Sequence, residues 1–179
     1  MAGGRRFARC AAPLLALLVL SGCGLTHLQD LQFRVDERLH FVSPKARTTV
    51  HQPVTISWTI RDFTVAAPGS QPPTRDAGYF AVFADETPIK PGHTLKDVGH
   101  GDPFCENDPK CPDRKYLRDH NVFTTTGTSM KFPILPAITG DKSRIQMHTF
   151  TVVLLDTSGH RIGESAWELD LRIPKTGIL

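Results

Sequence analysis

The chain has 179 residues, of which 40% are hydrophobic, 22% charged and 8% aromatic. This composition is that of a globular protein and excludes collagen-like, low-complexity and wholly disordered classes. The formal net charge of +3 depends on Arg5, Arg6 and Arg9. Without these three, 18 of the 21 basic residues remain, equal to the 18 acidic residues. A neutral remainder argues against nucleic acid as a partner.

The N-terminal residues have the pattern of an export signal. Three arginines precede an apolar run of eleven residues, Cys10 to Leu20. As a helix this run would rise about 16 Å, roughly half of the ~30 Å hydrocarbon core of a bilayer. Residues 1–22 are therefore predicted to be a signal peptide and not a membrane span.

The residues that follow are Leu20-Ser21-Gly22-Cys23. This sequence resembles the lipobox of bacterial lipoproteins, in which two small residues precede a lipid-modified cysteine. The resemblance implies that Cys23 becomes the first mature residue and carries a diacylglyceryl group. Two acyl chains anchor a protein stably, whereas one gives marginal binding. The expected location is the extracytoplasmic side of the cell membrane, or the outer membrane where there is one. The alternative is an ordinary secretory signal with a chance cysteine.

The mature chain is expected to hold a tether, residues 23–30, and one domain, residues 31–179. In residues 54–60, VTISWTI, apolar side chains alternate with Thr and Ser. This period of two is typical of an antiparallel strand with one buried face. The run YFAVF at residues 79–83 is apolar on both faces and predicts a central strand.

Several further strands are expected on the same grounds. Residues 122–124 and 130–132 should form a hairpin around Gly127. Residues 150–155 and 167–173 should form a second hairpin, joined by a tight turn at 156–159. The total of about seven short strands, without a sustained helical stripe, predicts an all-β antiparallel sandwich. Weaker alternation places Leu31, Phe33, Val35, Leu39, Phe41 and Val50 in strands, and Trp58 and Trp167 are expected on core faces.

The run from Pro53 to Thr59 is similar to the strand that carries a core Trp in fibronectin type III and related immunoglobulin-like domains. The resemblance covers only part of the domain and implies an immunoglobulin-like fold. It implies nothing about function, since this architecture hosts many functions.

Residues 91–121, called the excursion below, are polar and contain four Pro and three Gly. They are expected to form a long irregular loop, which in a compact domain is either functional or hides an element. Once Cys23 is lipidated, Cys105 and Cys111 remain as an even pair outside the cytoplasm, which predicts a disulfide. Phe104 and Tyr116 are candidates for exposed aromatic side chains that would recognise a partner.

Histidines offer a second interpretation of the excursion. His93, His100 and His120 lie in or beside it, and imidazole is a ligand for copper and zinc. Their spacing matches no common metal motif, and the acidic residues near the disulfide match no EF-hand. His148 is expected to lie at the edge of a strand.

The sequence therefore favours a non-enzymatic binding or scaffolding module. It contains no nucleophile elbow, zinc-protease motif or phosphate-binding loop. The expected partners are the lipid bilayer, through Cys23, and a protein of the cell envelope, with no cofactor and no nucleic acid. The alternative is an extracytoplasmic copper- or zinc-binding protein that uses His93, His100 and His120.

Overall fold

The computed structural model describes residues 36–175. The lipobox at 20–23, the tether at 23–30 and the alternating residues 31–35 lie outside these described residues and stay predictions. Within residues 36–175, no helix combines the length and the apolar character needed to cross a membrane.

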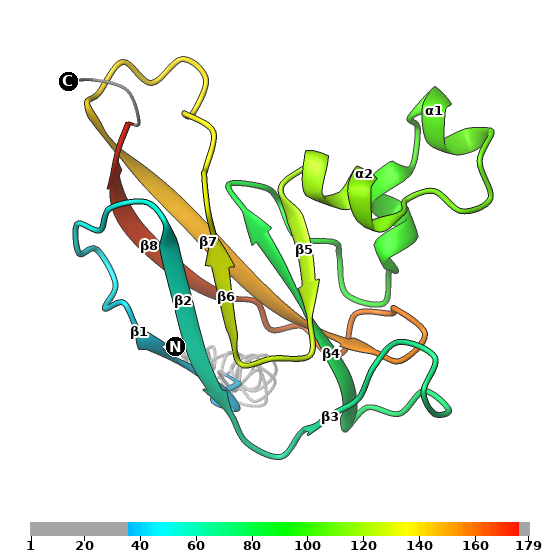
Figure 1. Cartoon of the computed structure of the whole chain (residues 1–179). Coiled ribbons are helices and arrows are strands. Elements are labelled where there is room, and N and C mark those ends of the chain that lie inside the picture. Colours follow the sequence, from blue (N-terminus) through cyan, green and yellow to red (C-terminus); the bar gives the residue numbers. More distant parts are fainter. Residues whose placement is uncertain (1–35, 176–179) are drawn as a thin grey trace, which may run out of the picture. The chain divides into compact units, whose positions relative to one another are not determined.

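The described chain is an all-β sandwich, as predicted, with eight strands in place of about seven and with three short helical segments (Figure 1). The three helical segments are η1, α1 and α2, and all of them lie in the excursion. In chain order the elements are β1 (Leu39–Ser43), β2 (Val54–Ile60), β3 (Thr64–Val65), β4 (Ala77–Ala84), η1 (Leu95–Gly99), α1 (Pro103–Glu106), α2 (Arg114–Asp119), β5 (Val122–Thr125), β6 (Ser129–Phe132), β7 (Ile145–Asp156) and β8 (Trp167–Pro174).

The strands form two sheets. The smaller sheet has the order β1-β2-β6. The larger sheet has the order β3-β4-β7-β8, and β5 also pairs with β4. All pairs are antiparallel except the short β3–β4 pair, which is parallel. The central strand predicted at 79–83 is β4, which is hydrogen-bonded to neighbours on both of its edges.

The main core lies between the two sheets. The apolar side chains of β2 point into it, and Trp58 is only 2% exposed, which confirms both the alternation and the packing role of this Trp. The ring of Trp58 meets that of Phe80 on β4 edge-on, with centroids 5.3 Å apart. Such edge-to-face pairs add to the free energy gained from burial. Trp167 is only half-buried, and its indole N–H donates to the Asp36 carbonyl at 2.8 Å.

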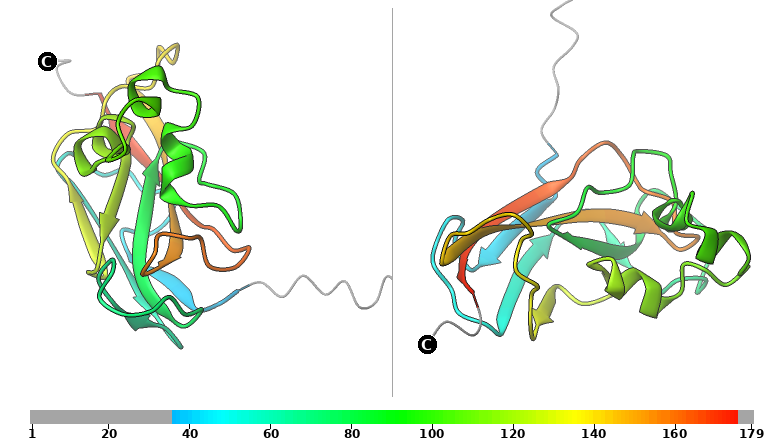
Figure 2. Two further views of the ribbon diagram at one scale, coloured as in Figure 1. Left: turned by 90° about the vertical axis from the view of Figure 1, so that its right-hand side faces the viewer. Right: turned by 90° about the horizontal axis from the view of Figure 1, so that it is seen from above.

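A second core covers the opposite face of the larger sheet. Tyr79, Ala81 and Phe83 of β4 point away from the main core and pack with Leu117 of α2 and Ile89. The excursion is therefore a covering layer and not only a loop. The further views place it on the side of the larger sheet that lies away from β1 and β2 (Figure 2).

The hairpin predicted around Gly127 is wrong in its pairing. Both strands exist, but β5 pairs with β4 in the larger sheet, whereas β6 pairs with β2 in the smaller one. The chain between them crosses from one sheet to the other. Local alternation marks the strands but does not reveal their partners, because each partner is distant in sequence.

The hairpin predicted at the C-terminal end is confirmed. β7 and β8 pair in register from Val152 opposite Trp167 to Ile145 opposite Pro174. At the turn, the Asp156 carboxylate accepts from the backbone N–H of Ser158 at 2.8 Å and of His160 at 3.0 Å. Gly159 has φ of 90°, a left-handed conformation that favours glycine.

His148 is buried, contrary to the expectation that it lies at an edge. Its side chain is 2% exposed, and its Nδ1 lies 2.6 Å from the Asp85 carboxylate. Asp85 directly follows β4 with φ of 60°, and its carboxylate also accepts from the Thr149 N–H at 2.9 Å. A buried polar ring needs such a partner, because an unpaired one would be costly to desolvate.

Candidate functional site

The excursion has more order than the sequence indicated. Each of its helical segments begins at a side chain that accepts a backbone N–H: Thr94 for η1, Asp102 for α1 and Asp113 for α2. Ser, Thr, Asp and Asn are preferred at this position because they satisfy otherwise unpaired amide groups. These segments have four to six residues, too few for a helical stripe to be visible in the sequence.

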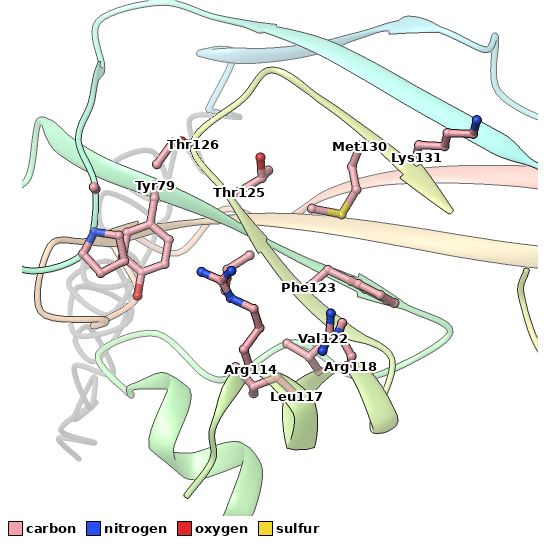
Figure 3. A pocket seen from close by; sticks show the side chains of 13 residues that line it. Tyr79, Arg114, Leu117, Arg118, Val122, Phe123, Thr125, Thr126, Met130 and Lys131 are labelled. Atoms are coloured by element: carbon pink, nitrogen blue, oxygen red, sulfur yellow. The ribbon is translucent and has the colours of Figure 1, made fainter. Parts of the chain in front are cut away.

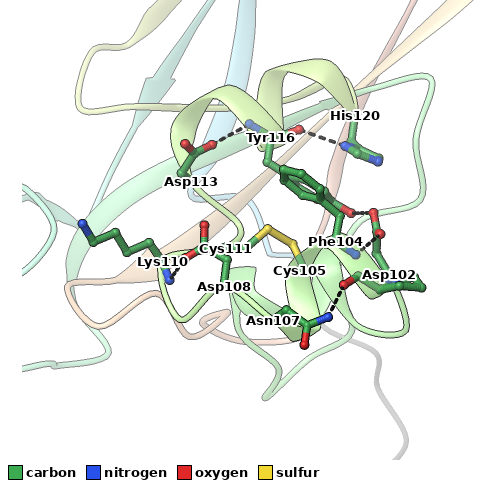
Figure 4. The surroundings of a disulfide bond; sticks show 11 residues. Asp102, Phe104, Cys105, Asn107, Asp108, Lys110, Cys111, Asp113, Tyr116 and His120 are labelled. Atoms are coloured by element: carbon green, nitrogen blue, oxygen red, sulfur yellow. Dashed lines mark hydrogen bonds between the residues drawn. A yellow bond between two sulfur atoms is a disulfide. The ribbon is translucent and has the colours of Figure 1, made fainter.

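One carboxylate links α1 to α2. Oδ1 of Asp102 accepts the backbone N–H of Phe104 at 2.9 Å, and Oδ2 accepts the hydroxyl of Tyr116 at 2.6 Å (Figure 4). The same tyrosine lies against His120, with ring centroids 4.0 Å apart. Asp102 thus holds the start of α1 to the middle of α2.

The predicted disulfide joins Cys105 of α1 to Cys111, with Cα atoms 4.9 Å apart. Closing so small a ring stabilises the fold by only about 2 kcal/mol on the loop-entropy account. Its main effect is therefore local. Gly99, the last residue of η1, packs directly on it, since a Cβ there would lie 2.5 Å from the Cys105 sulfur. The disulfide, η1, α1 and α2 form one small unit.

Of the two aromatic residues predicted to be exposed, only one is. Phe104 is 73% exposed, so it does not pack inside its own loop. Tyr116 is 9% exposed and its hydroxyl is bound by Asp102, so its assignment as an exposed recognition residue is wrong. A tyrosine at a helix position that faces the sheet is drawn into the second core.

The Asp102–Tyr116 hydrogen bond changes the ionisation of both groups. Donation from the Tyr116 hydroxyl, followed by the Phe104 N–H, lowers the pKa of Asp102. The same hydrogen bond raises the pKa of Tyr116 to about 12. The Asp102 contribution to stability is therefore present above the ordinary aspartate pKa and is lost as the pH falls through the lowered value. The Tyr116 contribution is present below about 10 and is lost as the pH rises through 12.

The three histidines proposed as metal ligands line one cavity of about 570 Å³, together with Glu86 and Asp97. Nδ1 of His93 lies 3.6 Å from Asp97, and Nδ1 of His120 lies 2.9 Å from the Tyr116 carbonyl oxygen. Nevertheless, across residues 36–175 no three His, Cys, Asp or Glu side chains are close enough to share a metal ion. The fold gathers these histidines without assembling a complete ligand set.

A second surface was missed by sequence reasoning. A groove of about 540 Å³ lies between α2, β5 and β6 (Figure 3). Its walls include apolar or aromatic side chains from three strands, and Figure 3 shows Met130 reaching into it from β6. The lining residues used below are Tyr79, Arg114, Arg118, Phe123, Met130 and Lys131. We call this surface the cationic groove.

The cationic groove is charged although the mature chain is neutral. Arg114 and Arg118 of α2 line it, Lys131 stands at its rim, and none of its 13 lining residues is Asp or Glu. Among the described residues, these three cations have no carboxylate within 4.0 Å. By contrast, Lys115 on the same helix is paired with Asp119. The sequence carried a weak signal, since Arg114 and Arg118 are four residues apart, but their strand partners lie in no motif.

Comparison with known proteins identifies no relative: no family model, no curated protein and no solved structure matches the chain. Function is therefore argued from the residues alone.

The clamp predicts an unusual tyrosine titration. The chain contains two tyrosines, and burial raises the pKa of Tyr79 as well. We expect the absorbance of the native protein to show no tyrosine ionising near its ordinary pKa of about 10, and urea to restore two ordinary titrations. Asp102→Asn should return one native tyrosine toward 10, whereas Asp108→Asn, in the same disulfide ring, should not. A tyrosine titrating near 10 in the unmodified native protein would contradict the clamp.

Proposed function

We propose that this protein is a lipid-anchored envelope lipoprotein whose β-sandwich is a non-enzymatic binding module. The anchor is Cys23, the tether is residues 23–30, and the domain faces the extracytoplasmic side. The recognition surface is centred on Phe104. The observation that carries the proposal is the 73% exposure of a phenylalanine on a segment fixed by a disulfide and by Asp102.

The energetic argument concerns pre-organisation. An exposed aromatic ring has apolar area to bury and few rotatable bonds to immobilise, and such residues are frequent hot spots of interfaces. Phe104 is held by its own backbone hydrogen bond to Asp102, and the adjacent Cys105 is held by the disulfide. A partner that covers Phe104 therefore pays little entropy to order the backbone beneath it.

The anchor is tested by Cys23→Ser. We expect the unmodified protein to sediment with membranes, to be released by detergent and to carry the mass of a lipid group. The serine variant should lack the lipid mass and leave the membrane fraction. An unmodified protein without lipid, processed by ordinary signal cleavage, would contradict the anchor while leaving the binding proposal open to its own test.

The recognition surface is tested by photo-cross-linking in living cells. A photoreactive phenylalanine analogue at position 104 should give a discrete protein adduct. The matched control carries the analogue at Val42, a 59% exposed residue on β1, and should give none. Removing the disulfide by Cys105→Ser with Cys111→Ser should weaken the adduct at 104. Equal adducts from both positions, or none from 104, would overturn the assignment of Phe104.

A metal-binding protein is the second candidate, favoured by the position of His93, His100 and His120 around one cavity. The side chains would have to rotate to complete a ligand set, so binding should be weaker than at a preformed site. Titration calorimetry with copper and zinc should show stoichiometric binding that His93→Ala weakens and His51→Ala, an exposed control, leaves unchanged. Heat that is independent of His93 would remove this candidate.

A further inference from the structure

We propose that the cationic groove binds an extended acidic segment of a partner protein, which adds as a strand to the free edge of β5. This inference goes beyond the proposed function, because it uses neither Phe104 nor the lipid anchor. It is carried by three observations: an unpaired strand edge, an apolar floor and cations that no carboxylate neutralises.

The first observation is the unpaired edge. Within residues 36–175, β5 is hydrogen-bonded to β4 alone. The Asn121 carbonyl accepts from the Ala84 N–H at 2.9 Å. Because backbone groups alternate along a strand, Phe123 and Thr125 also face β4, whereas Val122 and Thr124 present N–H and C=O groups to the open side. A peptide that pairs with an exposed edge gains affinity from these main-chain hydrogen bonds.

The second observation is the place where the edge lies. β6 pairs only with β2 among the described strands, so each of the two sheets ends at this groove. Phe123 and Met130 line the space between the two sheet ends, next to Leu117. An added strand would place alternate side chains on this apolar floor, which favours an amphipathic segment.

The third observation gives the charge of the occupant. Arg114, Arg118 and Lys131 line the groove, and no acidic side chain does. An arginine binds a carboxylate through two parallel hydrogen bonds, which are stronger than those between neutral groups. The complementary segment therefore alternates Glu or Asp with apolar residues. The arginines come from α2, which directly precedes β5, so carboxylates on a strand paired with β5 would meet them.

Cations beside an exposed strand also serve to prevent edge-to-edge aggregation. That role requires no ligand and predicts no preference for acidic peptides. The experiment below separates the two roles, because loss of a protective charge increases self-association whereas loss of a binding charge weakens the peptide.

The test uses the full chain in detergent micelles and a labelled peptide of alternating Glu and Val. We expect saturable binding in fluorescence anisotropy, and slower hydrogen exchange at the backbone of residues 122–125. The matched peptide of alternating Lys and Val should not bind. The Glu-Val peptide methylated on alternate backbone nitrogens keeps its charge but loses the donors for strand pairing, so it should also fail.

The variants assign the site. Arg114→Gln with Arg118→Gln should weaken the Glu-Val peptide by about tenfold or more, since charge-assisted hydrogen bonds are lost. Lys115→Gln removes the same charge from the same helix outside the groove and should change the affinity little. Circular dichroism of each variant shows whether it is folded.

Four outcomes would overturn the proposal. They are failure of the Glu-Val peptide to bind at all, equal binding of the methylated peptide, equal weakening by Lys115→Gln, and self-association of the double variant with unchanged peptide binding. Competition by inorganic phosphate with the same dependence on Arg114 and Arg118, without protection of β5, would assign the groove to a small anion instead.

Discussion

The fold depends on a strand that is buried on every side. β4 pairs with β5 and β7 along its two edges, and all eight of its residues are buried. Phe80 and Val82 enter the core between the sheets, while Tyr79 and Phe83 enter the core on the opposite face. Leaving the second face in water would expose large apolar side chains, at a cost of about 1.5–3 kcal/mol for each. A covering layer is therefore a requirement of this strand.

The excursion meets that requirement with few apolar residues. Leu117 of α2 and Ile89 pack on the sheet, and Leu95 and Val98 add to them. The remaining side chains of the excursion are free to carry other features. Its outward surface holds Phe104, one wall of its cavity holds the three histidines, and α2 supplies the arginines of the cationic groove. Every candidate site of the domain is thus attached to the layer that covers β4.

Local patterns predicted the strands well and their partners poorly. The alternation in β2, the apolar run in β4 and the C-terminal hairpin are confirmed because burial on one or both faces is recorded in successive residues. The pairing of β5 and β6 was wrong, since register between distant segments is set by the whole core. Tyr116 and His148 were misplaced for a related reason: their partners, Asp102 and Asp85, are 14 and 63 residues away. The cationic groove was missed because it joins residues from α2, β5 and β6.

The sequence by itself determined the all-β class, the central strand and the disulfide between Cys105 and Cys111. Each of these follows from a period of two, from uniform apolarity or from the parity of cysteines, which are properties of neighbouring or countable residues. Only the tertiary structure decided that the excursion is a covering layer, that Phe104 is exposed while Tyr116 is buried, and that Arg114 and Arg118 line a groove without acids. Those features depend on which surfaces meet when the two faces of β4 are buried, and the order of residues along the chain does not record that.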